Sequence, residues 1–465
     1  MAKTGTMFGW LDSKFIFSPG ALFSWGLVLT HNLVDYACVS IIMLFYTKDE
    51  KVKHLAVSAI LVSLQDGLTS FFAILLARIK DTRKGRFYAI LLSTSSYITG
   101  LSILWSYAKR SSANLHIPQY LLASFLLAVG KGGTDPLLKS FLSDQLIQND
   151  NGPSPNEEEE KQLLVCKNLW WQSGRYGGAV LAIFAFLGAK WSRVFAVALI
   201  MMGASLSFFF CGFIWYGYKD PNYLIMISHE QQNRNANINR VKNENMKCLL
   251  IFTCIGYSMV LATGSTFYEG QGDLMDDLHI NHKIVRFSLF IVIKTFISHI
   301  TILTFWLCGA KRQQVMLIRI GTGMVCAVIS CLTAWKVELE RQSNAHLSML
   351  WMCPQFVLLG LVEGLAQSGL EKLFENESFR NLWGQSKEVV SCFGNFLNIL
   401  CIVIFRRWFK NFGKDHSHLD RYYIMITVLS SVFLCIYVGV AVAYAKTTPE
   451  NVEEDRRNTE GNGTA

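Results

Sequence analysis

About a dozen apolar stretches, each about twenty residues long, occupy the chain from Leu22 to Tyr444 with only short polar segments between them. The hydrocarbon core of a bilayer is about 30 Å thick, so a helix needs about twenty apolar residues to cross it. The composition agrees, because 51% of the residues are hydrophobic and only 17% are charged. The sequence therefore predicts an all-α, multi-pass membrane protein embedded in the lipid bilayer.

The expected membrane spans fall into two groups of six. They lie near 21–46, 55–79, 86–108, 117–145, 165–188 and 193–217, and near 246–268, 284–309, 314–336, 347–372, 386–406 and 421–446. This pattern predicts an N-terminal six-helix bundle over 21–217 and a C-terminal one over 246–446. Residues 218–245 form a predicted cytoplasmic linker, 1–20 a cytoplasmic N-terminus and 447–465 a disordered cytoplasmic tail. Two such bundles are typical of transporters of the major facilitator type, whose solute site lies near the middle of the membrane.

Lysine and arginine predict the orientation of the chain. With the N-terminus inside, the basic segments Arg78–Arg86, Lys219–Lys247 and Lys311–Arg319 all face the cytoplasm. Both termini are then cytoplasmic, in either the plasma membrane or the vacuolar membrane. The same loops explain the net charge of +9, and no basic tract or aromatic reader module accompanies it to indicate a nucleic-acid partner.

Cysteines and short catalytic motifs give no sign of a metal, a cofactor or an enzyme. The twelve cysteines lie in or beside apolar spans and show no CxxC spacing, so we expect small apolar fillers rather than disulfides or a zinc site. Gly321-Thr322-Gly323 lies within an apolar stretch without a Rossmann context, and neither GxSxG nor HExxH is present.

Several short motifs occur in order along nearly the whole chain. They read Asp81-Thr82-Arg83-Lys84-Gly85-Arg86, Gly130-Lys131-Gly132-Gly133-Thr134-Asp135-Pro136 with Phe141 and Asp144-Gln145, Asn168-Leu169-Trp170-Trp171, Arg319-Ile320-Gly321-Thr322-Gly323, and Trp351-Met352-Cys353-Pro354-Gln355 with Gly360, Glu363 and Glu371. Taken together, these segments resemble the plant nitrate/peptide transporter family, within the proton-dependent oligopeptide transporter group.

The resemblance implies a secondary transporter that moves a small polar solute, such as nitrate, a short peptide or a related organic anion, by alternating access. It also implies roles for particular residues. Asp81, Gly85 and Arg86 match the family's D-x-x-x-G-R pattern and would latch the cytoplasmic gate. Glu371 lies where the family uses a carboxylate for contact with the solute or the gate.

The chain departs from the family pattern where the family couples transport to protons. The E-x-x-E-R motif of the first helix falls on Val28, His31 and Asn32, so both carboxylates and the cation are missing. The lysine of the fourth helix falls on Asp135, although Lys131 lies one turn earlier. Three hypotheses stay open: a proton symporter with a rearranged relay, an uncoupled facilitator, and a receptor or partner protein that keeps the fold without transport.

Charged and polar residues inside the spans are the candidates for the solute or proton pathway. A charge at the centre of the membrane costs about 2.5–3.5 kcal/mol, so such residues persist where they are paired or face a wet cavity. The candidate residues are His31, Asn32, Asp35, Asp66, Lys131, Asp135, Lys294 and Glu371.

Spacing along the helices predicts how four of these residues pair. Lys131 and Asp135 lie four residues apart, which favours either a switch that meets an anionic or zwitterionic solute or a static pair that holds the bundle together. His31 and Asp35 have the same spacing. His31, with an unperturbed pKa of about 6.5, is either a proton carrier or a neutral donor to Asp35.

Overall fold

The computed structural model describes most of the chain. The described ranges are 19–39, 42–48, 55–77, 85–109, 117–146, 157–185, 190–216, 237–275, 280–307, 313–344, 347–374, 383–409 and 418–447. Every regular element within these ranges is helical. Most of the predicted linker and nearly all of both predicted termini lie outside the described residues, as does Asp81 of the gating motif.

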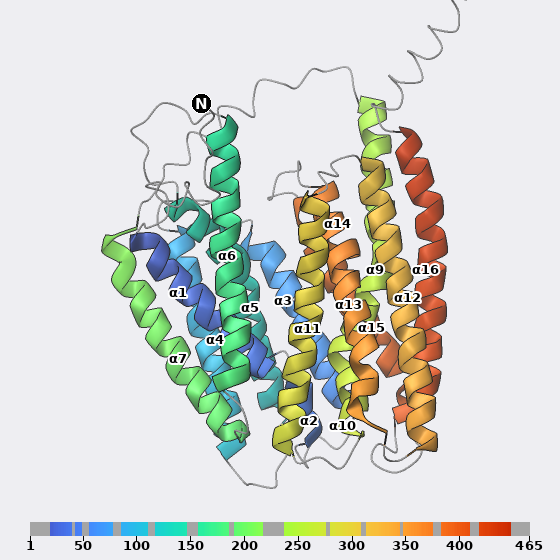
Figure 1. Cartoon of the computed structure of the whole chain (residues 1–465), viewed down its shortest axis with the longest axis horizontal. Helices are drawn as coiled ribbons and strands as arrows, with labels where there is room; N and C mark the ends of the chain where they lie inside the picture. The colour runs from blue at the N-terminus through green and yellow to red at the C-terminus, as the bar shows by residue number, and fades with distance from the viewer. Residues whose placement is uncertain are drawn as a thin grey trace, which may run out of the picture. The chain divides into compact units, whose positions relative to one another are not determined.

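A helix lies over each of the twelve predicted spans (Figure 1), and three of these helices extend seven to nine residues beyond the predicted limits. The first half of the chain forms α1 (Pro19–Val34), α2 (Ile42–Lys48), α3 (Leu55–Leu76), α4 (Gly85–Lys109), α5 (Ile117–Gln145), α6 (Glu157–Ala185) and α7 (Trp191–Cys211). The second half forms α9 (Asn237–Thr263), α10 (Glu269–Asp273), α11 (Ile280–Leu307), α12 (Gln313–Ser343), α13 (Cys353–Val362), α14 (Ser368–Leu373), α15 (Ser386–Ile404) and α16 (Leu419–Thr447). Short 3₁₀ turns lie at Gly212–Ile214, Met349–Met352, Trp383–Gln385 and Arg406–Phe409.

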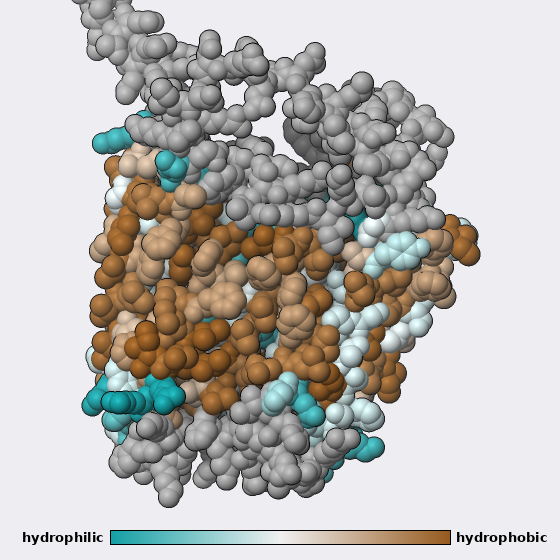
Figure 2. Space-filling view, turned by 180° about the vertical axis from the view of Figure 1, so that it is seen from behind, coloured by the Kyte–Doolittle hydropathy of each residue, from teal (hydrophilic) through white to brown (hydrophobic). Residues whose placement is uncertain are grey.

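The described helices have the length and surface of an integral membrane protein. Eleven of them are long and apolar enough to cross a bilayer. The remaining predicted span, 165–188, corresponds to α6, which carries Lys167 and Arg175 within that span. Figure 2 shows one face on which hydrophobic side chains gather over the middle of the helices and hydrophilic ones lie at their ends. Large apolar side chains such as Leu92, Ile200 and Ile318 are exposed, because lipid rather than water is their solvent.

The chain packs as two compact units. Unit 1 comprises 1–42 and 75–229, and unit 2 comprises 43–74 and 230–465. Most of α3 therefore packs within unit 2, although it belongs to the first half of the sequence. Its Ser63 hydroxyl accepts a hydrogen bond of 2.9 Å from the Asn398 amide on α15, and the Tyr422 hydroxyl donates to Asn398 Oδ1 at 2.6 Å. The predicted bundle limits, 21–217 and 246–446, follow the order of the sequence and stay a prediction.

Close helix contacts in unit 1 depend on glycine. In α5, a Cβ atom added at Gly130 would lie 2.5 Å from the Cβ of Tyr97 on α4 and 2.8 Å from its backbone nitrogen. Because a backbone atom cannot move aside as a flexible side chain can, this position accepts only glycine without a shift of the helices. The contact brings α5, and with it Lys131 and Asp135, close to its neighbour.

In the described part of the chain, three π-helical turns interrupt the long helices, and each contains an acidic residue or directly precedes one. The turns are η1 (Asp35–Val39) after α1, η3 (Gly264–Tyr268) between α9 and α10, and η5 (Glu363–Gln367) between α13 and α14. Asp35 and Glu363 are the first residues of their turns, and Glu269 directly follows η3. Single π turns often occur at functional sites, because the extra residue breaks the regular hydrogen-bond ladder and redirects side chains.

The α4–α5 contact gives a first testable prediction. Replacing Gly130 with Ala should lower the free energy of unfolding by about 1–3 kcal/mol, because the added methyl group overpacks against the Tyr97 backbone. Thermal unfolding in detergent measures the effect. The matched control is Gly203→Ala on α7, where a Cβ meets nothing within 4 Å. Equal melting temperatures for both variants would contradict the prediction.

Candidate functional site

Four of the predicted site residues come together in unit 1, where α1 and η1 pack against α5. The Lys131 ammonium on α5 lies 2.8 Å from the Asp35 carboxylate in η1. His31 Nδ1 on α1 lies 3.4 Å from the Asp135 carboxylate on α5. His31 is 2% exposed, whereas the Asp135 side chain is 47% exposed. The four residues form a group of two basic and two acidic side chains that come from α1, η1 and α5.

These pairs correct the expectation that each residue bonds to its neighbour along the same helix. The structure shows Lys131 paired with Asp35 and His31 in contact with Asp135, so both pairs cross between helices. The reason is that side chains four residues apart lie on one face, and here both faces point at the packed partner helix. An ion pair across two helices holds them together, and its release would let them separate.

His31 and α4 contain buried polar groups without a hydrogen-bond partner in the described part of the chain. The His31 ring lies 4.9 Å from the Tyr97 ring of α4. Among the described residues, His31 Nε2, the Tyr97 hydroxyl and the Thr94 hydroxyl are buried and have no hydrogen-bond partner. Buried polar groups are nearly always paired with protein, water or ligand. A polar ligand or water would satisfy these groups.

Asn32 plays a more local part. Its side-chain amide donates a hydrogen bond of 2.8 Å to the Val28 carbonyl one turn earlier on α1. This bond satisfies the amide within its own helix.

Unit 2 contains the other predicted charges. Lys294 on α11 lies 2.7 Å from the Glu363 carboxylate in η5, and both side chains are about three-quarters buried, at 23% and 24% exposed. Asp66 on α3 accepts a hydrogen bond of 3.3 Å from the Ser265 hydroxyl in η3. Glu371 lies on α14 and is exposed. Glu363, which is not among the predicted pathway residues, is thus the partner of one of them, Lys294.

Two buried carboxylates of unit 2 are not among the site residues that the sequence predicts. Glu269 on α10 is 2% exposed, and Glu338 on α12 is fully buried. Both lie just beyond the predicted ends of their spans, 246–268 and 314–336, where a charged residue is expected to face water. The sequence around Glu269, with Tyr268 before it and Gly270 after it, indicates burial only weakly. Tertiary packing shows that the side chain is enclosed.

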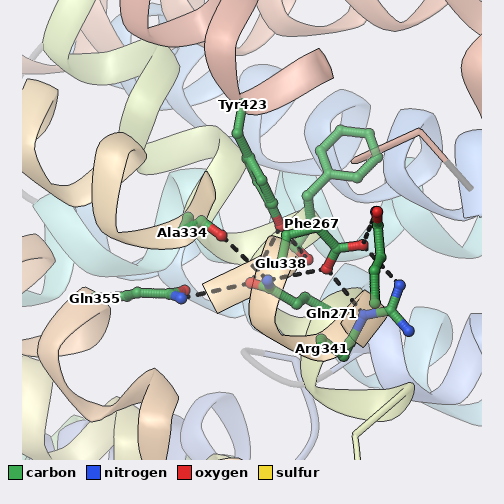
Figure 3. Close-up of polar contacts among 8 residues, drawn as sticks. Phe267, Gln271, Ala334, Glu338, Arg341, Gln355 and Tyr423 are labelled. Atoms are coloured by element: carbon green, nitrogen blue, oxygen red, sulfur yellow. Dashed lines mark hydrogen bonds and ion pairs between the residues drawn. The ribbon is translucent and has the colours of Figure 1, made fainter. Parts of the chain in front are cut away.

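Glu338 belongs to a well-satisfied polar network (Figure 3). Its carboxylate accepts bonds of 2.9 and 2.6 Å from the Arg341 guanidinium and of 3.0 Å from the Gln271 amide. Gln271 Oε1 in turn lies within 3.5 Å of the donors of Gln355 and Tyr423. The network ties α10 to α12, α13 and α16, so it fixes the short helix that carries Glu269.

Buried arginine supports the third π turn. Arg319 on α12 donates a hydrogen bond of 2.5 Å to the Gly364 carbonyl in η5 and another to the Ser368 hydroxyl. Its guanidinium also lies over the Phe305 ring, 4.4 Å from the ring centroid. Arg319 is 2% exposed. It therefore holds the backbone of η5 beside Glu363.

The described part of the gating motif lies at one end of unit 1. Gly85 begins α4, and the Arg86 guanidinium forms an ion pair with the Asp144 carboxylate near the end of α5. This ion pair links the start of α4 to the end of α5. Among the described residues, no group of three or more His, Cys, Asp or Glu side chains is placed to hold a metal ion.

Comparison with curated proteins confirms the resemblance seen in the sequence. No protein-family model matches the chain. Its curated homologues are Arabidopsis thaliana NRT1/PTR family proteins. They include family members 5.7 (24% identical, covering 82% of this chain and 81% of the relative), 5.6 (23%, covering 82% and 83%) and 5.12 (22%, covering 93% and 94%).

Solved structures confirm the predicted fold. The chain is similar to an auto-inhibited POT family peptide transporter (TM-score 0.66, 15% identical, covering 92% of this chain and 96% of that chain). It is also similar to the POT family transporter PepTSo (TM-score 0.67, 15% identical, covering 93% and 99%). A third structure is a POT family transporter in complex with 5-aminolevulinic acid (TM-score 0.68, 13% identical, covering 94% and 98%). At this identity the likeness establishes the fold alone, a nearly all-helical fold that the chain shares with these structures.

The ion pairs of unit 1 give a second prediction. In a double-mutant cycle, Asp35→Asn and Lys131→Met should show a coupling energy of about 0.5–3 kcal/mol, since the two groups are in contact and partly buried. Unfolding in detergent measures each variant. The comparison cycle pairs Lys131→Met with Asp135→Asn, and its coupling should be smaller. A larger coupling in the second cycle would contradict the crosswise arrangement.

The network around Glu338 gives a third prediction. Replacing Glu338 with Gln should lower the free energy of unfolding by about 1–3 kcal/mol, because the Arg341 guanidinium loses a buried, charged acceptor. The control is Glu340→Gln, an exposed carboxylate on the same helix, whose effect should stay within about 0.5 kcal/mol. Equal stability of both variants would show that the network does not contribute measurably to the free energy of unfolding.

Proposed function

We propose that this relative of the NRT1/PTR and POT transporters is a secondary transporter that moves a small polar solute across the membrane by alternating access. The observation that supports the proposal best is the Lys131–Asp35 ion pair between α5 and η1, with the His31–Asp135 contact beside it on α1 and α5. Ionised residues inside a membrane protein are costly, and they commonly mark a solute or ion path. The fold adds support, since solved POT family transporters cover more than nine-tenths of this chain.

The ion pairs favour a solute with charged ends. Lys131 and Asp35 neutralise each other at 2.8 Å, so a solute carboxylate or nitrate could take the place of Asp35 at Lys131. An ammonium group could likewise replace Lys131 at Asp35. Such exchange costs little, because each buried charge always keeps a partner. Two structural neighbours are described in complex with 5-aminolevulinic acid and with a thioalcohol-conjugated peptide, and nitrate, a short peptide or a related organic anion is the solute class we propose here.

Alternating access requires contacts that form in one state and break in another. The Arg86–Asp144 pair and the start of α4 at Gly85 are the proposed latch, and with both termini in the cytoplasm they lie at the cytoplasmic end. Arg86 then controls the rate of the conformational change rather than the affinity for the solute. Asp81, outside the described residues, is proposed as part of the same latch.

A second candidate function is a receptor or partner protein on the same fold. It is favoured by the residues at Val28, His31 and Asn32, which lack the carboxylates and the cation of the family's first helix. An uncoupled facilitator would show the same sequence. The two differ in whether any solute crosses the membrane.

Uptake into reconstituted vesicles tests the proposal. The purified chain should take up at least one solute of a panel of nitrate, dipeptides and small organic anions with saturable kinetics. Preloading the vesicles with the same unlabelled solute should accelerate uptake, which is the signature of a site that alternates between two sides. The receptor hypothesis is supported instead if no solute of the panel crosses faster than in empty vesicles.

The proposed latch gives a fourth prediction. Replacing Arg86 with Gln should lower the maximal uptake rate by about tenfold, equivalent to about 1.4 kcal/mol, and leave the half-saturating solute concentration unchanged. Initial rates over a range of solute concentrations separate the two parameters. Arg407→Gln, which removes an exposed arginine outside the latch, is the control. A raised half-saturating concentration with an unchanged maximal rate would show that Arg86 binds the solute.

A further inference from the structure

Unit 2 holds a cluster of ionisable side chains around Glu269, a residue that the family motifs do not include. Asp66 on α3 and Lys294 on α11 both act electrostatically on the Glu269 carboxyl on α10. Lys294 is itself held at 2.7 Å by Glu363 of η5. The cluster thus contains three carboxyl groups and one amine, which come from α3, α10, α11 and η5. Of these elements, η5 is a π turn and α10 is the short helix that follows the π turn η3.

Glu269 differs from the other enclosed glutamate of unit 2. Glu338 is surrounded by donors from Arg341 and Gln271, so its charge is matched. Glu269 is 2% exposed, and its Oε2 atom is buried and has no hydrogen-bond partner among the described residues. An ionised carboxylate without donors is costly in such a place, and a neighbouring carboxylate adds to the cost. A neutral, protonated carboxyl removes both penalties.

We propose that the Glu269 carboxyl, enclosed beside Asp66 and Lys294, is the proton-binding site of this chain and replaces the carboxylates missing from its first helix. The proton arrives from water on one side of the membrane and leaves to water on the other, so only the O–H bond of Glu269 forms and breaks. Its use in transport rests on the proposed function, whereas proton binding itself does not.

The geometry links the proton to the shape of unit 2. With Glu269 protonated, Lys294 keeps Glu363 as its partner, and α11 stays tied to η5. With Glu269 ionised, Lys294 has a second carboxylate within electrostatic range and is drawn toward α10. The Gln271 network holds α10 to α12, α13 and α16, and Arg319 holds η5. The long lysine side chain is therefore the part that moves in response, while both carboxyl groups remain on fixed backbone.

Proton binding can be measured without any solute. Purified chain in membranes adsorbed on a solid support should give a transient charge displacement when the bathing pH is stepped down. Glu269→Gln should abolish this current, because glutamine copies the neutral carboxyl but cannot take up a proton. The matched control, Glu340→Gln, should keep the current. A current of wild-type size in Glu269→Gln, or one evoked by sodium rather than by pH, would overturn the proposal.

The stability of the folded variants tests separately whether Glu269 is neutral in the folded chain. Glu269→Gln should be as stable as the wild type at neutral pH, since it mimics the proposed resting form. Glu269→Asp should keep the current with a shifted pH midpoint, because the carboxyl remains but its position changes. A chain that unfolds with Gln but is stable with Asp would show that the ionised form is the structural one, and would also overturn the proposal.

Solute uptake distinguishes this inference from the proposed function. If a proton gradient drives uptake in the wild type and still does so in Glu269→Gln, the chain is a transporter and the proton site lies elsewhere. If the pH-step current depends on Glu269 but no solute of the panel is taken up, the proton site stands and the transport proposal fails.

Discussion

The cost of a charge away from water governs the interior of this protein. Each unit solves the problem by pairing groups from different helices, as with Lys131 and Asp35 in unit 1 and Lys294 and Glu363 in unit 2. Such pairs are weak evidence for stability, because desolvation cancels much of their attraction. Their value lies in the fact that one partner can be exchanged for another at little net cost. The same property suits a protein that must bind and release charged groups during a cycle.

Local distortion of the helices places these charges. A regular helix would present residues on one face at constant spacing, whereas a π turn inserts an extra residue and rotates the next stretch of helix. Asp35 and Glu363 begin such turns, and Glu269 comes directly after one. The turns need support from outside their own helices, and Arg319 supplies it for η5 by bonding to the Gly364 carbonyl. Irregular backbone and buried charge therefore occur together, each compensated by partners on neighbouring helices.

Much of the candidate site could be predicted from the sequence, but its connections could not. The cost of intramembrane charge singled out His31, Asp35, Lys131 and Asp135, and these four do lie together. Their spacing of four residues indicated pairs along one helix, and the structure shows pairs across two. Helical periodicity says which residues share a face, and it does not say what that face meets.

The sequence by itself determined the membrane setting and the order of the helices, and it placed most of their limits to within a few residues, because apolar length and turn residues are local properties of the chain. The ends of α6, α9 and α12 lie seven to nine residues beyond the predicted limits. The resemblance to the nitrate/peptide transporter family was also predicted from short motifs that occur in order along the chain. Only the tertiary structure decided that Glu269 and Glu338 are enclosed, that one of them is matched by Arg341, and that α3 packs with unit 2. Burial and pairing of a charged group depend on elements distant in the sequence, and no pattern along one helix records what another helix brings to it.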